Sequence, residues 1–176
     1  MRPLNPRVQS AVIVRAHLPR SLERLRRYAV ADAAHGVPAH VTLLYPFVAA
    51  DELTATLRST LAAIVRRVPA FDYRLSGPRR WPDTTYAAVE PGAPFMRLHR
   101  DLARAFPAYP IYGRPGFRLT PHITVAEGAA ADDPATLRHE GWTALPIEAR
   151  ATAVEVIASD AADRWRIVWR LPLGAG

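Results

Sequence analysis

The chain has 176 residues, of which 49% are hydrophobic, and a formal net charge of +7. This length suffices for one domain with a substantial core, or for two small lobes that share a core. No apolar run is long enough to span a membrane, the N-terminal apolar segment is too short and broken for a signal peptide, and there is no cysteine for a disulfide or a thiolate metal site. We therefore expect a cytoplasmic globular protein with no membrane partner.

The first half of the chain predicts alternating strands and helices. Strands are expected at residues 11–14 and 40–47, and helices at residues 21–34 and 51–68. We expect Ser21 and Asp51 to cap the two helices at their N-termini, and Gly36 to end the first one. These two caps would supply acceptors for the free N–H groups of the first helical turns.

The second half predicts more strands than helices. Strands are expected at residues 71–77, 84–91, 119–128, 151–159 and 164–173, a helix at 95–106, and a short helix at 132–141 that Asp133 caps. Residues 78–83 and 109–116 read as loops, and the last two strands read as a hairpin. In the last strand, a period of two predicts that Trp165, Ile167, Trp169 and Leu171 face one way.

Two strands carry the same polar pattern. "HVTLLYPF" begins at His40, "PHITVA" contains His122, and each histidine is followed two residues later by a threonine, Thr42 and Thr124. Because side chains alternate across a strand, each strand presents an imidazole and a hydroxyl on one face and apolar residues on the other. Tyr45 falls on the apolar face, so we expect it to pack in the core.

If the two strands lie together, two imidazoles and two hydroxyls converge. One imidazole can take a proton while the other gives one, and the hydroxyls can donate hydrogen bonds to phosphoryl oxygens. The structural alternative is that each histidine caps the end of its strand and bonds to the backbone. One His-x-Thr motif would favour that alternative, whereas a matched pair in matched strands favours a functional site.

These residues also carry a resemblance. The segments "GVPAHVTLLYPF" and "LTPHITVAEG" resemble the two signature strands of the 2H phosphoesterase superfamily, most nearly its bacterial 2′-5′ RNA ligase and RNA 2′,3′-cyclic phosphodiesterase branch. "RRWPDTTYAAVEP" and the helix after it resemble the segment between the motifs in that branch. His40, Thr42, His122 and Thr124 match the catalytic positions of the family, whereas Thr120 departs from the basic or aromatic residue of many relatives.

The resemblance implies an α+β fold over residues 1–176. We expect one domain of two pseudo-symmetric lobes, with antiparallel or mixed sheets, helices on the outer faces and a central cleft. It also implies metal-independent hydrolysis of 2′,3′-cyclic phosphate ends of RNA or nucleotides, with 2′-5′ RNA ligation as a second activity of the same site. We expect no cofactor, no metal ion, no obligate protein partner and a monomeric state.

Two further points concern the chemistry. We assign His122 as the base and His40 as the acid, although pseudo-symmetry makes these two roles nearly interchangeable.

Four other residues are candidates for substrate contacts, either by stacking on a base or by contacting a phosphate or ribose: Tyr45, Trp81, Tyr112 and Arg118. The remaining histidines lack the strand context, and we expect His99 to lie on the protein surface.

Three other functions remain open. The same cleft could bind RNA or a nucleotide without turnover, which the basic charge supports but the matched imidazoles do not explain. The histidines could instead bind a metal ion, which the scarcity of carboxylates near both motifs disfavours. Finally, a 2H enzyme of this kind could act on a non-RNA substrate such as a cyclic phosphate on ADP-ribose.

Overall fold

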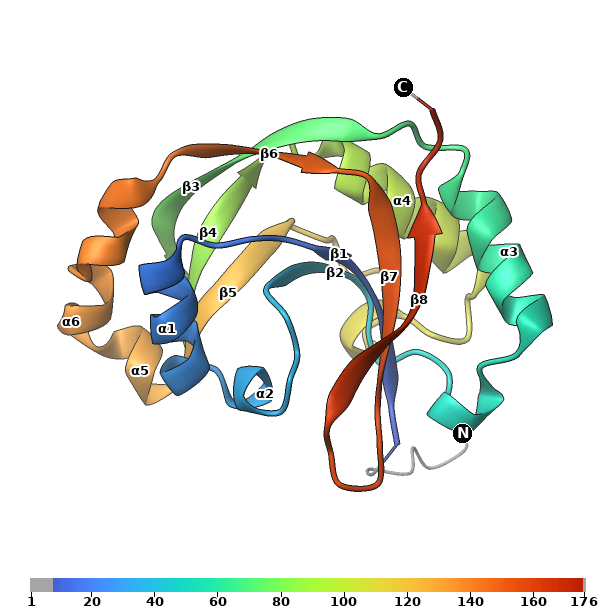
Figure 1. Cartoon of the computed structure of the whole chain (residues 1–176), viewed down its shortest axis with the longest axis horizontal. Coiled ribbons are helices and arrows are strands. Elements are labelled where there is room, and N and C mark those ends of the chain that lie inside the picture. Colours follow the sequence, from blue (N-terminus) through green and yellow to red (C-terminus); the bar gives the residue numbers. More distant parts are fainter. Residues whose placement is uncertain (1–7, 176) are drawn as a thin grey trace.

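Two four-stranded antiparallel sheets form the framework of the protein (Figure 1). The computed structural model describes residues 8–175. Its strands are β1 (Ser10–Arg15), β2 (His40–Leu44), β3 (Phe71–Trp81), β4 (Thr84–Glu90), β5 (His122–Glu127), β6 (Ile147–Ala151), β7 (Ala153–Ser159) and β8 (Trp165–Pro172). The first sheet has the order β2-β1-β7-β8 and the second β5-β4-β3-β6, which confirms the expected α+β class with antiparallel sheets.

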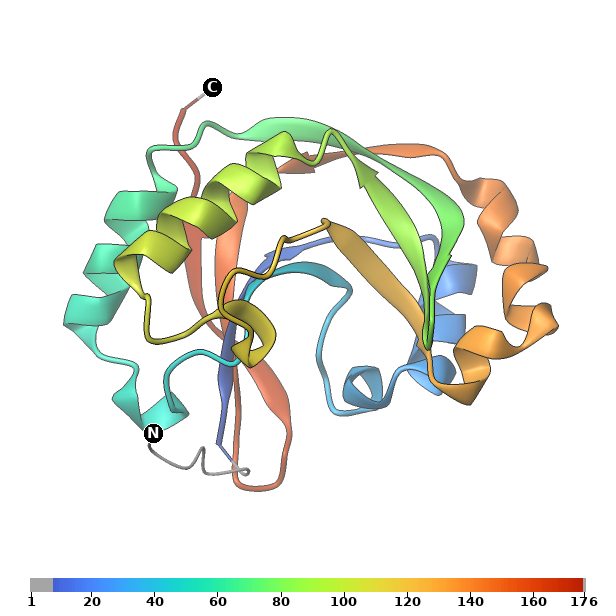
Figure 2. The ribbon, with the colours of Figure 1, turned by 180° about the vertical axis from the view of Figure 1, so that it is seen from behind.

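Helices flank the two sheets. The α-helices are α1 (Arg20–Ala29), α2 (Ala31–Ala34), α3 (Ala55–Val65), α4 (Ala93–Ala105), α5 (Ala129–Asp132) and α6 (Pro134–Leu137). The 3₁₀ turns are η1 (Ala50–Glu52), η2 (Ile111–Gly113) and η3 (Glu140–Ala144). Seen from front and back, α3 and α4 lie at one end of the molecule, and α1, α5 and α6 lie at the other (Figures 1 and 2). No described helix is long and apolar enough to cross a membrane.

Two helices pack across the two halves of the chain. Helix α1 follows β1 of the first sheet but contacts β5 of the second, and α4 follows β4 of the second sheet but contacts β2 of the first. The edge strands β2 and β5 also contact each other. This exchange brings the two strands that begin with histidine together at the centre of the molecule.

A shared apolar core joins the two sheets. It includes Val12 of β1 and Leu75 of β3, both fully buried, and the inner face of α4. On that face the ring of Phe95 lies 4.9 Å from the ring of Phe71 and 5.3 Å from that of Tyr73. Because burying such a side chain contributes about 1.5–3 kcal/mol, the core fixes the relative position of the sheets.

The helix ends differ in part from the sequence predictions. The Ser21 and Asp51 caps are wrong, because α1 begins one residue before Ser21 and α3 begins after Thr54, whose hydroxyl accepts a hydrogen bond from the Leu57 N–H. The single helix predicted at residues 21–34 is interrupted at Val30, which is buried in an extended conformation. The Asp133 cap is confirmed by its hydrogen bond to the Ala135 N–H at 2.8 Å.

The strands differ at three places. Strand β3 extends to Trp81, into the loop predicted at residues 78–83, and leaves only residues 82–83 as a turn. Its pairing shifts between Ser76 and Arg79, where a proline is tolerated at a bulge. Strand β6 was not predicted at all. The uniform face predicted for β8 is wrong, because a register shift opposite residues 156–157 turns Trp165 away from the face that carries Trp169.

Gly36 provides a test of the connection that leads into β2. It has φ +96°, and a Cβ atom at this position would lie 2.8 Å from the carbonyl oxygen of Trp165. We expect Gly36→Ala to reduce the free energy of unfolding by about 2 kcal/mol or more, because left-handed backbone costs alanine about 1–2 kcal/mol and the carbonyl must also move. Urea denaturation measures this change.

Gly116→Ala is the matched control. Gly116 also has a positive φ of +75°, but no atom lies within 4 Å of its Cβ position. It should therefore show the backbone cost alone. Equal losses in the two variants would contradict a steric role for the contact with Trp165.

Candidate active site

The two motif strands contribute to one cavity. His40 and Thr42 from β2, and His122 and Thr124 from β5, all line a cavity of about 190 Å³. As alternation requires, the intervening Val41 and Ile123 are fully buried in the core on the other face. The four residues singled out in the sequence are therefore brought together.

Each motif strand contains a bulge at the same place. Leu43 has no partner between the Ile13–Thr42 and Val12–Leu44 pairs, and Val125 has none between the Tyr86–Thr124 and Thr85–Ala126 pairs. A bulge shifts the alternation by one residue. It also leaves backbone groups unpaired, and the imidazole of His99 lies 2.8 Å from the Leu43 carbonyl, so the predicted surface position of His99 is wrong.

The bulges change which residues face the cavity. Tyr45 and Glu127, each five positions after its histidine, both line it. The face predicted for Tyr45 is therefore wrong, because the prediction assumed unbroken alternation, although its half-buried ring does pack against a small cluster of buried apolar residues. The Tyr45 hydroxyl donates to the side-chain oxygen of Gln9 at 2.6 Å, and its ring lies 6.3 Å from that of Trp165. Burial, together with the charge of Asp32, raises the pKa of Glu127.

Hydrogen bonds orient both imidazoles in the same way. Nδ1 of His40 lies 2.7 Å from the Pro38 carbonyl, and Nδ1 of His122 lies 2.8 Å from the Thr120 carbonyl. Since a carbonyl can only accept, Nδ1 carries the proton in each neutral ring and Nε2 carries the lone pair. Each histidine therefore does bond to the backbone, as the purely structural alternative requires, but only through Nδ1. Its Nε2 atom remains available for proton transfer. In the first motif, Nε2 lies 3.0 Å from the Thr42 hydroxyl, which donates to it.

The two imidazoles differ in electrostatic environment. Burial, together with the nearby charge of Arg26, lowers the pKa of His40 from its ordinary 6.5 to about 4, against the hydrogen bond to Pro38. Burial also lowers the pKa of His122, against the hydrogen bond to Thr120. His40 is therefore neutral at pH 7.

The other sequence candidates lie at different distances from the cavity. Tyr112 lines it, with its side chain close to Thr42. Trp81 ends β3 instead of lying in a loop, and its ring packs 4.6 Å from the His122 ring but does not line the cavity. Arg118 is exposed and does not line the cavity.

Several cavity residues escaped the sequence analysis. Arg26 and Asp32 line the cavity from α1 and α2, and Trp165 lines it from β8. A signal for Arg26 existed: it stands four residues after Leu22, on the apolar face of its helix. Within residues 8–175, no group of three or more histidine, aspartate and glutamate side chains is arranged to hold a metal ion.

The imidazole geometry predicts an NMR result. In the free protein, both rings should occupy the Nδ1–H tautomer, and His40 should titrate with a midpoint near pH 4. Nitrogen-15 spectra recorded across a pH series measure both properties, and His40→Gln and His122→Gln variants assign the signals. A His40 midpoint at or above 6.5 would contradict the buried environment described here.

The chain is similar in sequence and in structure to known proteins. The family model of the 2′-5′ RNA ligase superfamily matches residues 14–163. The Geobacillus kaustophilus protein named "Putative phosphoesterase GK0864" is 26% identical over 142 residues, which cover 79% of this chain and 74% of that protein. Two similar solved structures are E. coli LigT complexed with 3′-AMP (TM-score 0.57, 19% identity, covering 94% of this chain and 97% of LigT) and TT0787 of Thermus thermophilus (TM-score 0.53, 19% identity, covering 95% and 98%). The protein belongs to the 2′-5′ RNA ligase superfamily and has the fold of LigT.

Proposed function

We propose that the protein hydrolyses 2′,3′-cyclic phosphate ends of RNA or nucleotides without a metal ion. The observation that carries this proposal is the shared geometry of the two motifs. Both imidazoles are held at Nδ1, and both line one cavity together with the two threonine hydroxyls. When water attacks a phosphodiester, the reaction needs a general base, a general acid and hydrogen-bond donors for the phosphoryl oxygens. The two imidazoles and the two hydroxyls can supply these groups.

In the proposed reaction, one imidazole accepts a proton from water and the other donates a proton to the leaving oxygen. Water attacks the phosphorus in line with the leaving ribose oxygen while one neutral imidazole takes its proton. The P–O bond to the ribose oxygen breaks, and the other imidazole, protonated at the start, donates its proton to that oxygen. Thr42 and Thr124 hold the non-bridging oxygens, so the Thr42 hydroxyl turns from His40 to the phosphate when substrate binds.

The surroundings of the imidazoles favour an exchange of the roles first assigned. His40 is the more strongly shielded from water and lies near a cation, and both effects disfavour its charged form. We therefore assign His40 as the base and His122 as the acid. The rings of Trp81 and Tyr86 pack edge-on against His122 at 4.6 and 5.5 Å and hold its orientation.

Structural relatives support a phosphorylated ribose as the substrate. LigT of E. coli has been crystallised with 3′-AMP and with NADP⁺, both of which are adenine nucleotides that carry a phosphate on ribose. Two aromatic side chains, Tyr45 and Tyr112, also line the cavity together with Thr42 and Thr124. Their rings are available to contact a nucleoside.

The proposal predicts turnover of a nucleoside 2′,3′-cyclic monophosphate in the presence of EDTA. His40→Ala and His122→Ala should each reduce kcat by about 10²- to 10⁴-fold, because each removes one proton-transfer group. His17→Ala is the matched control, since His17 is exposed and lies outside the cavity, and it should retain full activity. Chromatography of substrate and product measures the rates.

Other outcomes separate the alternatives. Loss of wild-type turnover on chelation would contradict the metal-independent scheme, and full activity in either histidine variant would contradict the two-histidine scheme. If the wild type does not cleave the mononucleotide, RNA ending in a cyclic phosphate and a cyclic phosphate of ADP-ribose are tested next. Binding without cleavage of all three would favour a binding module.

The pH dependence of kcat/KM tests the exchanged roles. As the base, His40 must be neutral, so activity should rise as pH increases through about 4. As the acid, His122 must be protonated, so activity should fall as pH increases through its pKa, which burial places below 6.5. The profile should therefore be bell-shaped with an acidic optimum between these limits. A profile that stays flat across this range would contradict the scheme.

A further inference from the structure

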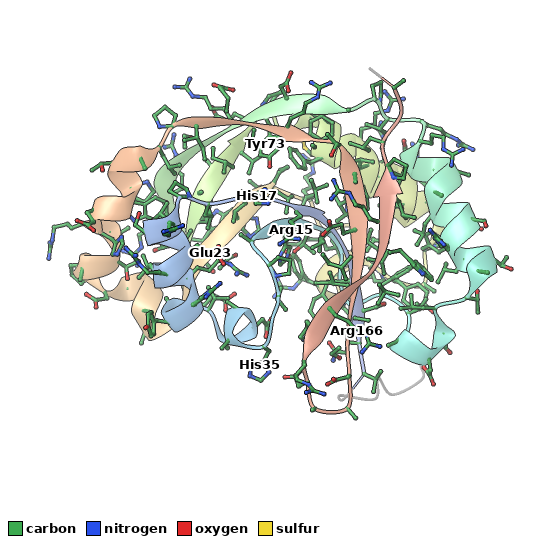
Figure 3. All side chains as sticks on the ribbon, viewed as in Figure 1. Arg15, His17, Glu23, His35, Tyr73 and Arg166 are labelled. Atoms are coloured by element: carbon green, nitrogen blue, oxygen red, sulfur yellow. The ribbon has the colours of Figure 1, made fainter. Side chains whose placement is uncertain are left out.

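Arg26 is a charged residue buried beside the first motif. Its side chain is only 3% exposed, and it lines the cavity from α1. Nη1 donates to the Val37 carbonyl at 3.0 Å and Nη2 donates to the Pro38 carbonyl at 3.1 Å. Its acidic neighbour on the helix is Glu23, whose carboxylate lies 3.6 Å from Nη1 of Arg26. Figure 3 labels Glu23 on α1. The guanidinium therefore holds the two residues that lead into β2.

The Pro38 carbonyl links Arg26 to His40. This oxygen accepts from Arg26 and also from Nδ1 of the imidazole at 2.7 Å. We propose that Arg26 is a positioning residue that fixes the Pro38 carbonyl and thereby keeps the His40 imidazole turned with its Nε2 lone pair toward the cavity. The effect on turnover rests on the proposed function, whereas the effect on the imidazole does not.

The second motif provides an internal comparison. There the equivalent acceptor is the carbonyl of Thr120, an exposed residue. Among the hydrogen bonds of residues 8–175, this carbonyl accepts from the imidazole of His122 and from no arginine. The first motif therefore has a buried cation at this carbonyl that the second motif lacks, and this cation adds to the difference in burial between the two histidines.

The same cation acts on His40 through its charge. A positive charge close to the imidazole disfavours a second proton on the ring, which adds to the effect of burial. Titratable and charged groups face β2 from the elements packed against it: Arg15 on β1, Arg26 on α1, Asp32 on α2, His99 on α4, Tyr112 on η2, and His122 and Glu127 on β5. Of these, Arg26 and His122 lower the His40 pKa.

The test compares Arg26 variants by NMR titration of the free protein. In Arg26→Met, the His40 midpoint should rise by about half a pH unit or more, and part of the ring should leave the Nδ1–H tautomer. In Arg26→Lys, the charge remains, so the midpoint should stay close to that of the wild type. Arg27→Met is the matched control, because Arg27 is exposed on the same helix and should change neither property.

Kinetics supply the second readout. Arg26→Met should reduce kcat for the cyclic nucleotide about tenfold or more and move the acidic limb of kcat/KM to higher pH. Arg26→Lys should lower kcat without moving that limb, because one ammonium group replaces a fork that reaches two carbonyls.

A folded Arg26→Met protein whose His40 midpoint and tautomer equal those of the wild type would overturn the proposal. If that variant does not fold, Arg26→Gln carries the same test, since it removes the charge but retains a hydrogen-bond donor. An unchanged midpoint and tautomer there would overturn the proposal equally. Because the titration needs no substrate, it decides the role of Arg26 even if the wild type does not hydrolyse cyclic phosphates.

Discussion

The hydrogen bond from each imidazole Nδ1 to the carbonyl two residues earlier is the constraint on which the site depends. It uses one nitrogen of each ring for structure and leaves Nε2 as the only nitrogen available for proton transfer. Without it, either ring could rotate or change tautomer, and both nitrogens would compete for the same proton. In the proposed reaction, the carbonyls of Pro38 and Thr120 therefore determine which nitrogen of each histidine takes part.

The arrangement of the sheets determines where these rings meet. Strands β2 and β5 are edge strands of different sheets, and each is covered by a helix that follows a strand of the other sheet. A bulge in each strand then brings a further side chain to the cavity, Tyr45 on one side and Glu127 on the other. The two motifs are thus alike in backbone and unlike in chemistry. In the proposed reaction, the buried guanidinium of Arg26 adds to that asymmetry and favours His40 as the base.

Local patterns predicted much of this structure because they depend on neighbouring residues alone. Alternation within His40–Leu44 placed His40 and Thr42 on one face, and the Asp133 cap needed only the next two residues. The features that escaped prediction depend on contacts distant in sequence. The bulge at Leu43 is defined by pairing with β1, and the role of Arg26 depends on where residues 37–38 pass. Strand β6 does alternate apolar residues with the exposed Glu148 and Arg150, but this pattern spans only five residues.

The central claim is that both motifs act on a single phosphorus atom. A crystal structure of the His40→Gln variant with a bound nucleoside 2′,3′-cyclic monophosphate tests it most directly. The account predicts that the hydroxyls of Thr42 and Thr124 each donate to a non-bridging oxygen, and that Nε2 of His122 lies within hydrogen-bond distance of a ribose oxygen on the phosphorus. A cyclic phosphate bound outside this cavity, or held by one motif only, would contradict it.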